Sequence, residues 1–108
     1  CGEILQTDKL EENLNVCPLC DYHYRISAYE RIAVMTDENS FQEISPDLIS
    51  NNPLEFKDKM PYVQRLQAAI KTTGIKDTTV CGTATIDGKP VALAVMDFRF
   101  MGGSMGVV

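Results

Sequence analysis

Two cysteines separated by two residues carry the clearest chemical signal in this sequence. Cys17 and Cys20 enclose Pro18-Leu19, and two thiolates on so tight a turn can reach one tetrahedral Zn²⁺ at about 2.3 Å. Cys1 precedes Cys17 by a gap typical of the two halves of a zinc ribbon. Cys1, Cys17 and Cys20 are therefore predicted metal ligands. The fourth ligand would be a cysteine just before Cys1 or, alternatively, His23.

The fourth cysteine of the chain, Cys81, lies far from the other three and among threonines. It is predicted to be a small core residue of a strand. Four cysteines so distributed do not resemble a secreted disulfide framework, which would be denser. They favour a metal site in a reducing compartment, with ordinary buried or free thiols as the alternative.

A glycine-rich stretch, Met101 to Gly106, is the second candidate site. Its Gly102 and Gly103 follow an apolar run, and glycines let a backbone approach a ligand closely and leave amides free to donate. Ser104 is placed to cap a helix starting just beyond, whose first amides could hold a phosphate or an oxyanion. A generic strand-to-helix turn explains the stretch equally well, because it lacks the Gly-Lys-Ser/Thr ending of a P-loop.

Other polar residues offer no recognisable catalytic set. A Ser–His–acid triad cannot be built because the single histidine lies beside the cysteines, and no paired carboxylates stand out. Asp97 and Arg99 are predicted to mark a strand end that emerges into solvent. Three charged residues near the cysteines are predicted to form a solvated face: Asp21, Arg25 and Arg31.

Composition restricts the function classes. Apolar residues make up 44% of the 108 residues and charged residues 23%, which is ordinary for a globular protein. The net charge of −5 weighs against nucleic-acid binding by the chain as a whole. No apolar run reaches the roughly 18–20 residues of a membrane span, and no signal peptide is visible. The chain starts at a cysteine and stops after a glycine stretch, so we expect a fragment of a longer protein.

The elements that position these residues follow from periodicity. Ser27 and Glu30 match a capping box that opens a helix. Asp87-Gly88 is a two-residue hairpin turn between an alternating strand and a continuously apolar strand that is expected to be covered on both faces. The expected elements are a helix over 28–35, a loop over 36–40, a short strand around Phe41 and Ile44, a linker over 45–53, a helix over 61–72 capped by Gly74, and strands over 79–86 and 91–96.

Longer segments resemble a known family. The run from Cys17 to Ala28 resembles the segment after the second zinc knuckle in the carboxyltransferase β subunits of bacterial-type acetyl-CoA carboxylase. Phe98 to Gly106 is similar to a Phe-Met-Gly-Gly-Ser-Met-Gly run that is specific to that family. Further matches occur in order along almost the whole chain: Tyr62 to Gly74, Lys76-Asp77, and Gly82 followed by Gly88.

The resemblance implies a mixed α and β fold. A four-cysteine zinc ribbon, whose first cysteine is missing here, would occupy residues 1–24. A helix and linker would follow over 25–60, and the start of a crotonase-like domain of ββα units would occupy 61–108. Val107 departs from the family, which usually has a small residue after the last glycine, so the local amide geometry there would differ slightly.

The resemblance also implies an activity. The β subunit would pair with an α subunit as α₂β₂, and work with biotin carboxylase and the biotin carboxyl carrier protein. Together they would move a carboxyl group from carboxybiotin to acetyl-CoA, giving malonyl-CoA for fatty-acid synthesis. Gly102, Gly103 and Ser104 would contact substrate. No catalytic side chain is implied in these residues, because the main oxyanion-hole glycines of the family lie downstream.

The same resemblance implies a cytoplasmic protein of a bacterium, or one of the plastid stroma. The fragment alone would be inactive. The competing interpretation is a zinc-ribbon module with a nucleic-acid-binding or regulatory role. Lys9, Arg25 and Arg31 could form a local basic patch for nucleic-acid binding.

Overall fold

A hairpin of two long strands is the centre of the computed structural model, which describes residues 1–106. Strand β2 (Thr79–Ile86) pairs antiparallel with β3 (Lys89–Met96) along their whole length. The turn residues Asp87 and Gly88 have φ angles of 51° and 73°, as a two-residue turn matching the strand twist requires. The hairpin predicted from Asp87-Gly88 is therefore confirmed.

A two-residue strand, β1 (Gln42–Glu43), pairs antiparallel with the other edge of β2, so the sheet order is β1-β2-β3. It lies between Phe41 and Ile44, where a short strand was predicted. Gly82 in β2 is buried beside β1. Only glycine fits there, because a Cβ would collide with the Gln42 carbonyl and the Phe41 ring. The sheet edge thus depends on a residue without a side chain.

Side chains alternate along β2, as the sequence predicts. Val80 and Ala84 are buried on the face that carries the core, whereas Cys81 and Thr83 point to the other face and are exposed. The prediction that Cys81 is a core residue is wrong. Its side chain lies on the face of the sheet opposite to that of Val80, and no part of residues 1–106 buries that thiol.

The apolar strand β3 is half covered rather than buried on both faces. Its residues alternate between partly buried Val91, Leu93 and Val95 and exposed Ala92 and Ala94. The prediction of cover on both faces therefore does not hold within the described residues. The continuous apolar run reflects one face packed against the core and one apolar face that residues 1–106 leave open.

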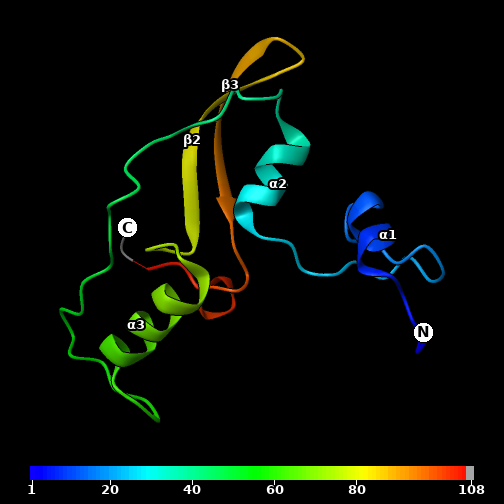
Figure 1. The fold of residues 1–108 in the computed structure, drawn as a ribbon. Helices are drawn as coiled ribbons and strands as arrows, with labels where there is room; N and C mark the ends of the chain where they lie inside the picture. The colour runs from blue at the N-terminus through cyan, green and yellow to red at the C-terminus, as the bar shows by residue number, and fades with distance from the viewer. Residues whose placement is uncertain (107–108) are drawn as a thin grey trace.

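Helix α2 (Ala28–Met35) covers the core face of the sheet (Figure 1). Its start is the predicted capping box: the Ser27 hydroxyl accepts from the Glu30 amide at 3.1 Å, and the Glu30 carboxylate accepts from the Ser27 amide at 2.6 Å. Met35, at the end of the helix, is 46% exposed. One cluster of buried residues forms the core: Ala28, Ile32, Leu66, Ile75, Val80 and Phe100.

Helix α3 (Tyr62–Thr73) ends at Gly74, whose φ of 77° gives the predicted left-handed cap. Leu66 is its buried residue, while Val63 is 44% exposed. Met60 is 42% exposed as well. The linker between β1 and α3 has no regular helix or strand, as predicted for residues 45–53, and runs along the edge of the sheet in Figure 1.

The cysteine-bearing segment lies apart from the sheet and joins it through an extended stretch (Figure 1). It contains a six-residue helix that the sequence reasoning missed, α1 (Thr7–Glu12), none of whose residues is buried. The radius of gyration is 16.5 Å, compared with about 13 Å for a compact domain of this length. The chain is therefore extended. None of its described helices is long and apolar enough to cross a membrane.

Candidate metal centre and glycine-rich turn

A tight backbone hairpin presents two of the cysteines. The Cys17 amide donates to the Tyr22 carbonyl at 2.8 Å, and the Asp21 amide donates back to the Cys17 carbonyl at 2.9 Å. Asp21 adopts a φ of 58°, a left-handed conformation that Asp tolerates better than most residues. Below the turn, Val16 and His23 form an antiparallel bridge. The knuckle is thus fixed by backbone bonds on both sides of Pro18-Leu19.

The predicted thiols converge. Cys1, Cys17 and Cys20 place their sulfurs within 4.8 Å of one another, and the sulfurs of Cys1 and Cys17 are 4.0 Å apart. Two sulfurs bound to one tetrahedral zinc at about 2.3 Å would be roughly 3.8 Å apart. Three thiols at such distances fit a soft divalent metal, and the three residues are placed to bind one.

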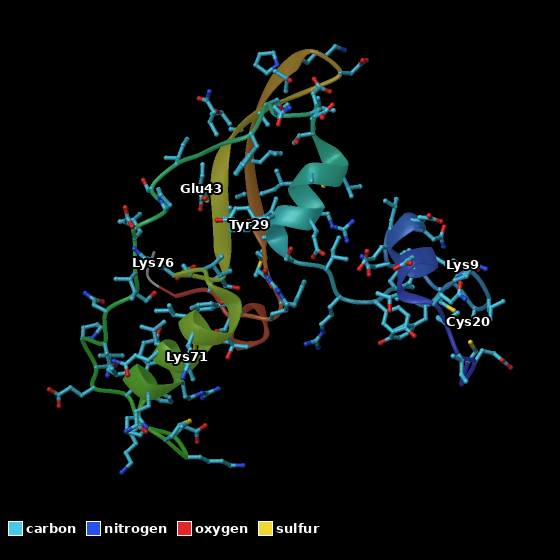
Figure 2. The ribbon with its side chains drawn as sticks, in the orientation of Figure 1. Lys9, Cys20, Tyr29, Glu43, Lys71 and Lys76 are labelled. Atoms are coloured by element: carbon cyan, nitrogen blue, oxygen red, sulfur yellow. The ribbon has the colours of Figure 1, made fainter. Side chains whose placement is uncertain are left out.

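The electrostatics of this cluster favour metal binding. The Tyr22 amide, and next the Cys17 thiol, lower the pKa of the Cys20 thiol, and the thiolate is the form that binds metal. Cys17 is buried, while Cys1 and Cys20 are exposed. Figure 2 shows Cys20 on the solvent side of the segment, on the same side as Lys9.

His23 does not join the cluster. Within residues 1–106 the group able to hold a metal consists of the three cysteines alone. His23 is exposed and stands in a bridge to Val16 on the strand leading away from the knuckle. The imidazole of His23 therefore lies outside the group of thiols.

The glycine stretch forms a 3₁₀ turn, η1 (Met101–Gly103), directly after Phe100. Gly102 and Gly103 have φ angles of 68° and 80°, which glycine adopts at no steric cost. The Gly103 amide donates to the Phe100 carbonyl at 2.9 Å, and the Ser104 amide donates to the Met101 carbonyl at 3.4 Å. The turn itself therefore occupies two of the amides that were predicted as donors.

Gly103 packs closely against a side chain of the protein itself. A Cβ there would come within 2.9 Å of the Phe98 ring. Gly102, by contrast, faces open space. Ser104 has an extended backbone at the end of η1, which is the conformation of an N-cap residue, and the helix expected beyond it falls largely outside the described residues.

Asp97 is buried rather than emerging into solvent, and the earlier prediction is wrong for this residue. Its exposed fraction is 0%. The Arg99 guanidinium donates to it from Nε at 3.0 Å and from Nη2 at 2.7 Å. The Ala28 amide donates to Oδ2 at 3.0 Å. Only the Arg99 partner behaves as predicted, with 42% of its side chain exposed.

Sequence reasoning also missed a pocket of about 490 Å³ beside β2. Within it, the Tyr29 hydroxyl donates to Glu43 at 2.8 Å, and these two side chains point toward one another in Figure 2. Burial, and then the Glu43 carboxylate, raise the pKa of Tyr29 to about 12. The two residues lie fourteen positions apart on different elements, so no local pattern could indicate the pair.

Comparison with known proteins identifies close relatives, although no protein-family model matches the chain. The chain is 47% identical over all 108 residues to the acetyl-coenzyme A carboxylase carboxyl transferase subunit beta of Citrifermentans bemidjiense, of which it covers 38%. It is 48% identical to the corresponding subunit of a Synechococcus strain and covers 37% of it. The chloroplastic subunit of Pyropia yezoensis is also 48% identical, with 38% covered.

The solved structures that resemble the chain are also of a carboxyl-transferring enzyme. Two crystal structures of transcarboxylase 12S, one with methylmalonyl-coenzyme A and methylmalonic acid bound, are similar to the chain with TM-scores of 0.52 and 0.55. The identities are 30% and 26%, over 74% and 93% of this chain and 13% and 16% of those chains. They confirm the predicted crotonase-like fold class.

The chain spans a little over a third of the length of the curated relatives that it matches. Its homologues are carboxyltransferases, from bacteria and from a chloroplast. From the first residue to the last, these 108 residues are therefore homologous to the N-terminal part of acetyl-coenzyme A carboxylase carboxyl transferase β subunits.

Proposed function

We propose that the complete protein is the β subunit of an acetyl-CoA carboxyltransferase, transferring the carboxyl group of carboxybiotin to acetyl-CoA to form malonyl-CoA. The observation that carries this proposal is identity of 47–48% along the whole chain to subunits of that name. The likeness to transcarboxylase 12S, also a carboxyltransferase, supports the reaction class.

The composition of the glycine stretch suits this chemistry. Deprotonating acetyl-CoA develops an enolate oxygen, and biotin gains negative charge as it loses its carboxyl group. Both changes need preorganised donors and close approach more than a nucleophilic side chain. We assign Gly102, Gly103 and Ser104 to substrate contact. Because the turn occupies the Gly103 and Ser104 amides, their contribution is a backbone that a substrate can approach closely.

The three converging thiols support a structural zinc. Cys1, Cys17 and Cys20 would hold it together with one further ligand. Segments with few buried apolar residues commonly depend on metal for their fold. We propose that the zinc orders residues 1–24, with a helix and linker over 25–60 and the carboxyltransferase domain beginning within 61–108.

The partners follow from the reaction. Carboxybiotin must arrive on a carrier, so the proposal includes the biotin carboxyl carrier protein, biotin carboxylase and a carboxyltransferase α subunit in an α₂β₂ assembly. The bacterial and chloroplastic relatives support a location in bacterial cytoplasm or plastid stroma.

Reverse carboxyl transfer tests the proposal. The complete β chain, co-purified with its α subunit, would be given malonyl-CoA and a soluble biotin derivative, and acetyl-CoA would be followed. We expect turnover that disappears when the α subunit is omitted. A folded, metal-loaded complex without turnover would contradict the proposal.

A weaker proposal concerns nucleic-acid binding by Lys9 of the cysteine segment, Arg25 just after it and Arg31 of α2, all of which are exposed. Three cations can give at most salt-sensitive, weak nucleic-acid binding against a net charge of −5. A gel shift at low salt with the complete protein tests it, and absence of retardation would remove this role.

A further inference from the structure

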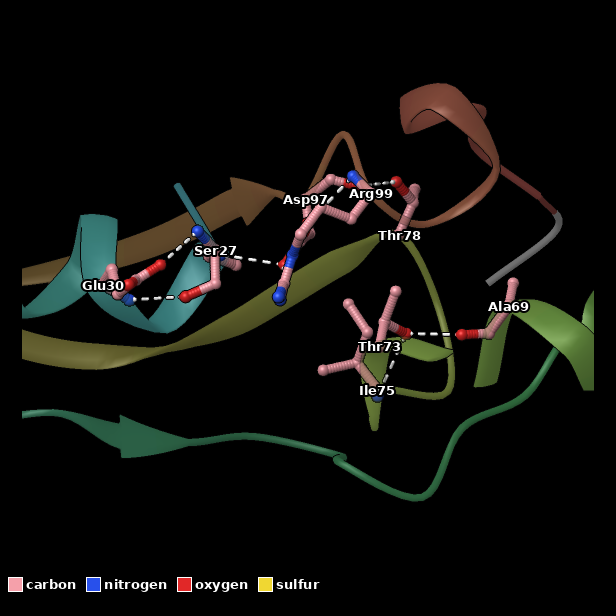
Figure 3. A network of polar contacts seen from close by, with 9 residues as sticks. Ser27, Glu30, Ala69, Thr73, Ile75, Thr78, Asp97 and Arg99 are labelled. Carbon is pink, nitrogen blue, oxygen red and sulfur yellow. Dashed lines mark hydrogen bonds and ion pairs between the residues drawn. The ribbon is translucent and has the colours of Figure 1, made fainter. Parts of the chain in front are cut away.

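The carboxylate of Asp97 is bound by donors from two separate segments of the chain. Oδ2 accepts from the Ala28 amide at 3.0 Å and from Arg99 Nη2 at 2.7 Å, while Oδ1 accepts from the Arg99 amide and from Arg99 Nε, both at 3.0 Å. Figure 3 shows this network between the start of α2 and the end of β3. Four donors thus fix a carboxylate that has no exposed surface.

The backbone of Asp97 leads directly into the glycine-rich turn. Its amide donates to the Thr78 carbonyl at 2.7 Å, and its carbonyl accepts from the Phe100 amide at 3.1 Å. The carbonyl of Phe100, which is 2% exposed in the core, in turn accepts from the Gly103 amide at 2.9 Å. Two successive backbone hydrogen bonds therefore link the Asp97 carbonyl to the Gly103 amide.

The far end of the turn is fixed by a second buried pair. The Ser50 hydroxyl donates to Asp77 at 3.3 Å, and both residues are buried. Gly106 lies so close that a Cβ there would collide with the Ser50 oxygen. The far end of the turn therefore packs against a buried polar pair that leaves no room for a side chain at Gly106.

Stability alone is a weak reason for a buried ion pair here. Desolvating a carboxylate is costly, and apolar replacements of similar volume are often as stable. The Arg99 guanidinium, with the Ala28 and Arg99 amides, nevertheless lowers the pKa of Asp97 to about 2 against the opposing effect of burial. The carboxylate is therefore charged at every working pH, and its directional bonds join the start of α2 to the residues that enter the turn.

We propose that Asp97 is a positioning residue for substrate binding: Arg99 and the Ala28 amide anchor its carboxylate, and its backbone, through Phe100, holds the glycine-rich turn in place. It touches no reacting atom, since its oxygens are occupied inside the protein. The inference rests on the proposed carboxyltransferase function. It adds a specific residue through which the core controls the substrate-facing backbone.

Asp97→Asn and Arg99→Lys in the complete α–β complex test this inference. Asp97→Asn keeps the shape but removes the charge, and Arg99→Lys keeps the charge but removes the two-pronged contact. Asp58→Asn is the matched control, because Asp58 forms an exposed ion pair with Arg65 at 3.6 Å. Reverse transfer gives kcat and KM for malonyl-CoA, well below the melting temperature of each variant.

We expect both test variants to lose about tenfold in kcat/KM, since small misplacements of binding groups have large effects on rate. Amide hydrogen exchange at Gly103 and Ser104 should become faster, while Asp58→Asn leaves kinetics and exchange unchanged. A lower melting temperature with wild-type kinetics and exchange would show a purely structural role and overturn the inference.

Two further outcomes separate this inference from the proposed function. If Asp97→Asn does not fold, Arg99→Lys decides by the same measurements, because it retains the carboxylate bond to Ala28. If the wild-type complex shows no turnover, the proposed function fails, whereas the exchange rates at Gly103 and Ser104 still decide whether Asp97 holds the turn.

Discussion

The cysteine segment and the sheet with its helices keep their shapes by different means. Of residues 1–24 only Cys17 is buried, and its partners there are other thiols. The sheet region instead buries a continuous cluster around Ile32, Val80 and Phe100. With the proposed zinc, the first region would depend on metal coordination, whereas the second depends on apolar burial. The two regions should therefore respond to different perturbations.

Metal removal should produce the largest difference between the regions. Structural zinc sites contribute on the order of 10 kcal/mol to folding at neutral pH, so Cys17→Ser in the complete protein should abolish zinc binding and order over residues 1–24. Elemental analysis and amide hydrogen exchange measure both effects. Cys81→Ser is the control, because that thiol lies on the exposed face of β2. A Cys17→Ser protein with full zinc and full protection would contradict this account.

Truncating a core side chain should destabilise the sheet region and leave the cysteine segment unchanged. Ile32 is 3% exposed, and Ile32→Ala should cost about 3 kcal/mol in the free energy of unfolding because it leaves a cavity between α2 and the sheet. Urea unfolding of the complete chain measures the change, and zinc content should stay constant. Val34→Ala on the same helix, where Val34 is 47% exposed, should change stability by less than about 0.5 kcal/mol. Equal effects at both positions would show that α2 is not seated as described.

The buried carboxylate should make the sheet region sensitive to acid. The Arg99 guanidinium lowers the pKa of Asp97 to about 2. The stability that the carboxylate contributes is therefore fully present above the unfolded pKa of about 3.9 and is lost as pH falls through about 2. Asp97→Asn should therefore cost about 2 kcal/mol at pH 7. That difference from wild type should shrink between pH 4 and pH 2 in urea titrations. A pH-independent difference would assign the loss to packing instead.

The helix cap should have the smallest effect. Ser27→Ala removes the hydroxyl that accepts from the Glu30 amide and should cost about 1 kcal/mol. Ser27→Thr keeps an acceptor and should recover most of this loss. Thermal unfolding of both variants provides the measurement, and a Thr variant as unstable as the Ala variant would argue against the capping box.

Local signals in the sequence were sufficient for the regular elements. The capping box at Ser27, the Asp87-Gly88 turn and the Gly74 cap each depend on neighbouring residues, and each is present. The cysteine spacing likewise predicted which three thiols converge. These features follow from backbone sterics and short-range hydrogen bonds, which a single sequence displays directly.

Features that depend on distant contacts were not predictable in this way. Asp97 lies 69 positions from Ala28, whose amide donates a hydrogen bond to its carboxylate. The sequence therefore showed only a charged residue at a strand end. Cys81 was misplaced because apolar character does not tell which face of a strand is covered. Helix α1, short and fully exposed, lacks an apolar stripe that could reveal it.

The central claim is that the glycine-rich turn belongs to a carboxyltransferase site, and two matched alanine variants test it most directly. Gly103 and Gly88 both have positive φ, at 80° and 73°, but a Cβ would meet the Phe98 ring only at Gly103. Reverse carboxyl transfer by the complete α–β complex should fall about a hundredfold in Gly103→Ala and stay near wild type in Gly88→Ala. Equal activity of the two folded variants would contradict the assignment.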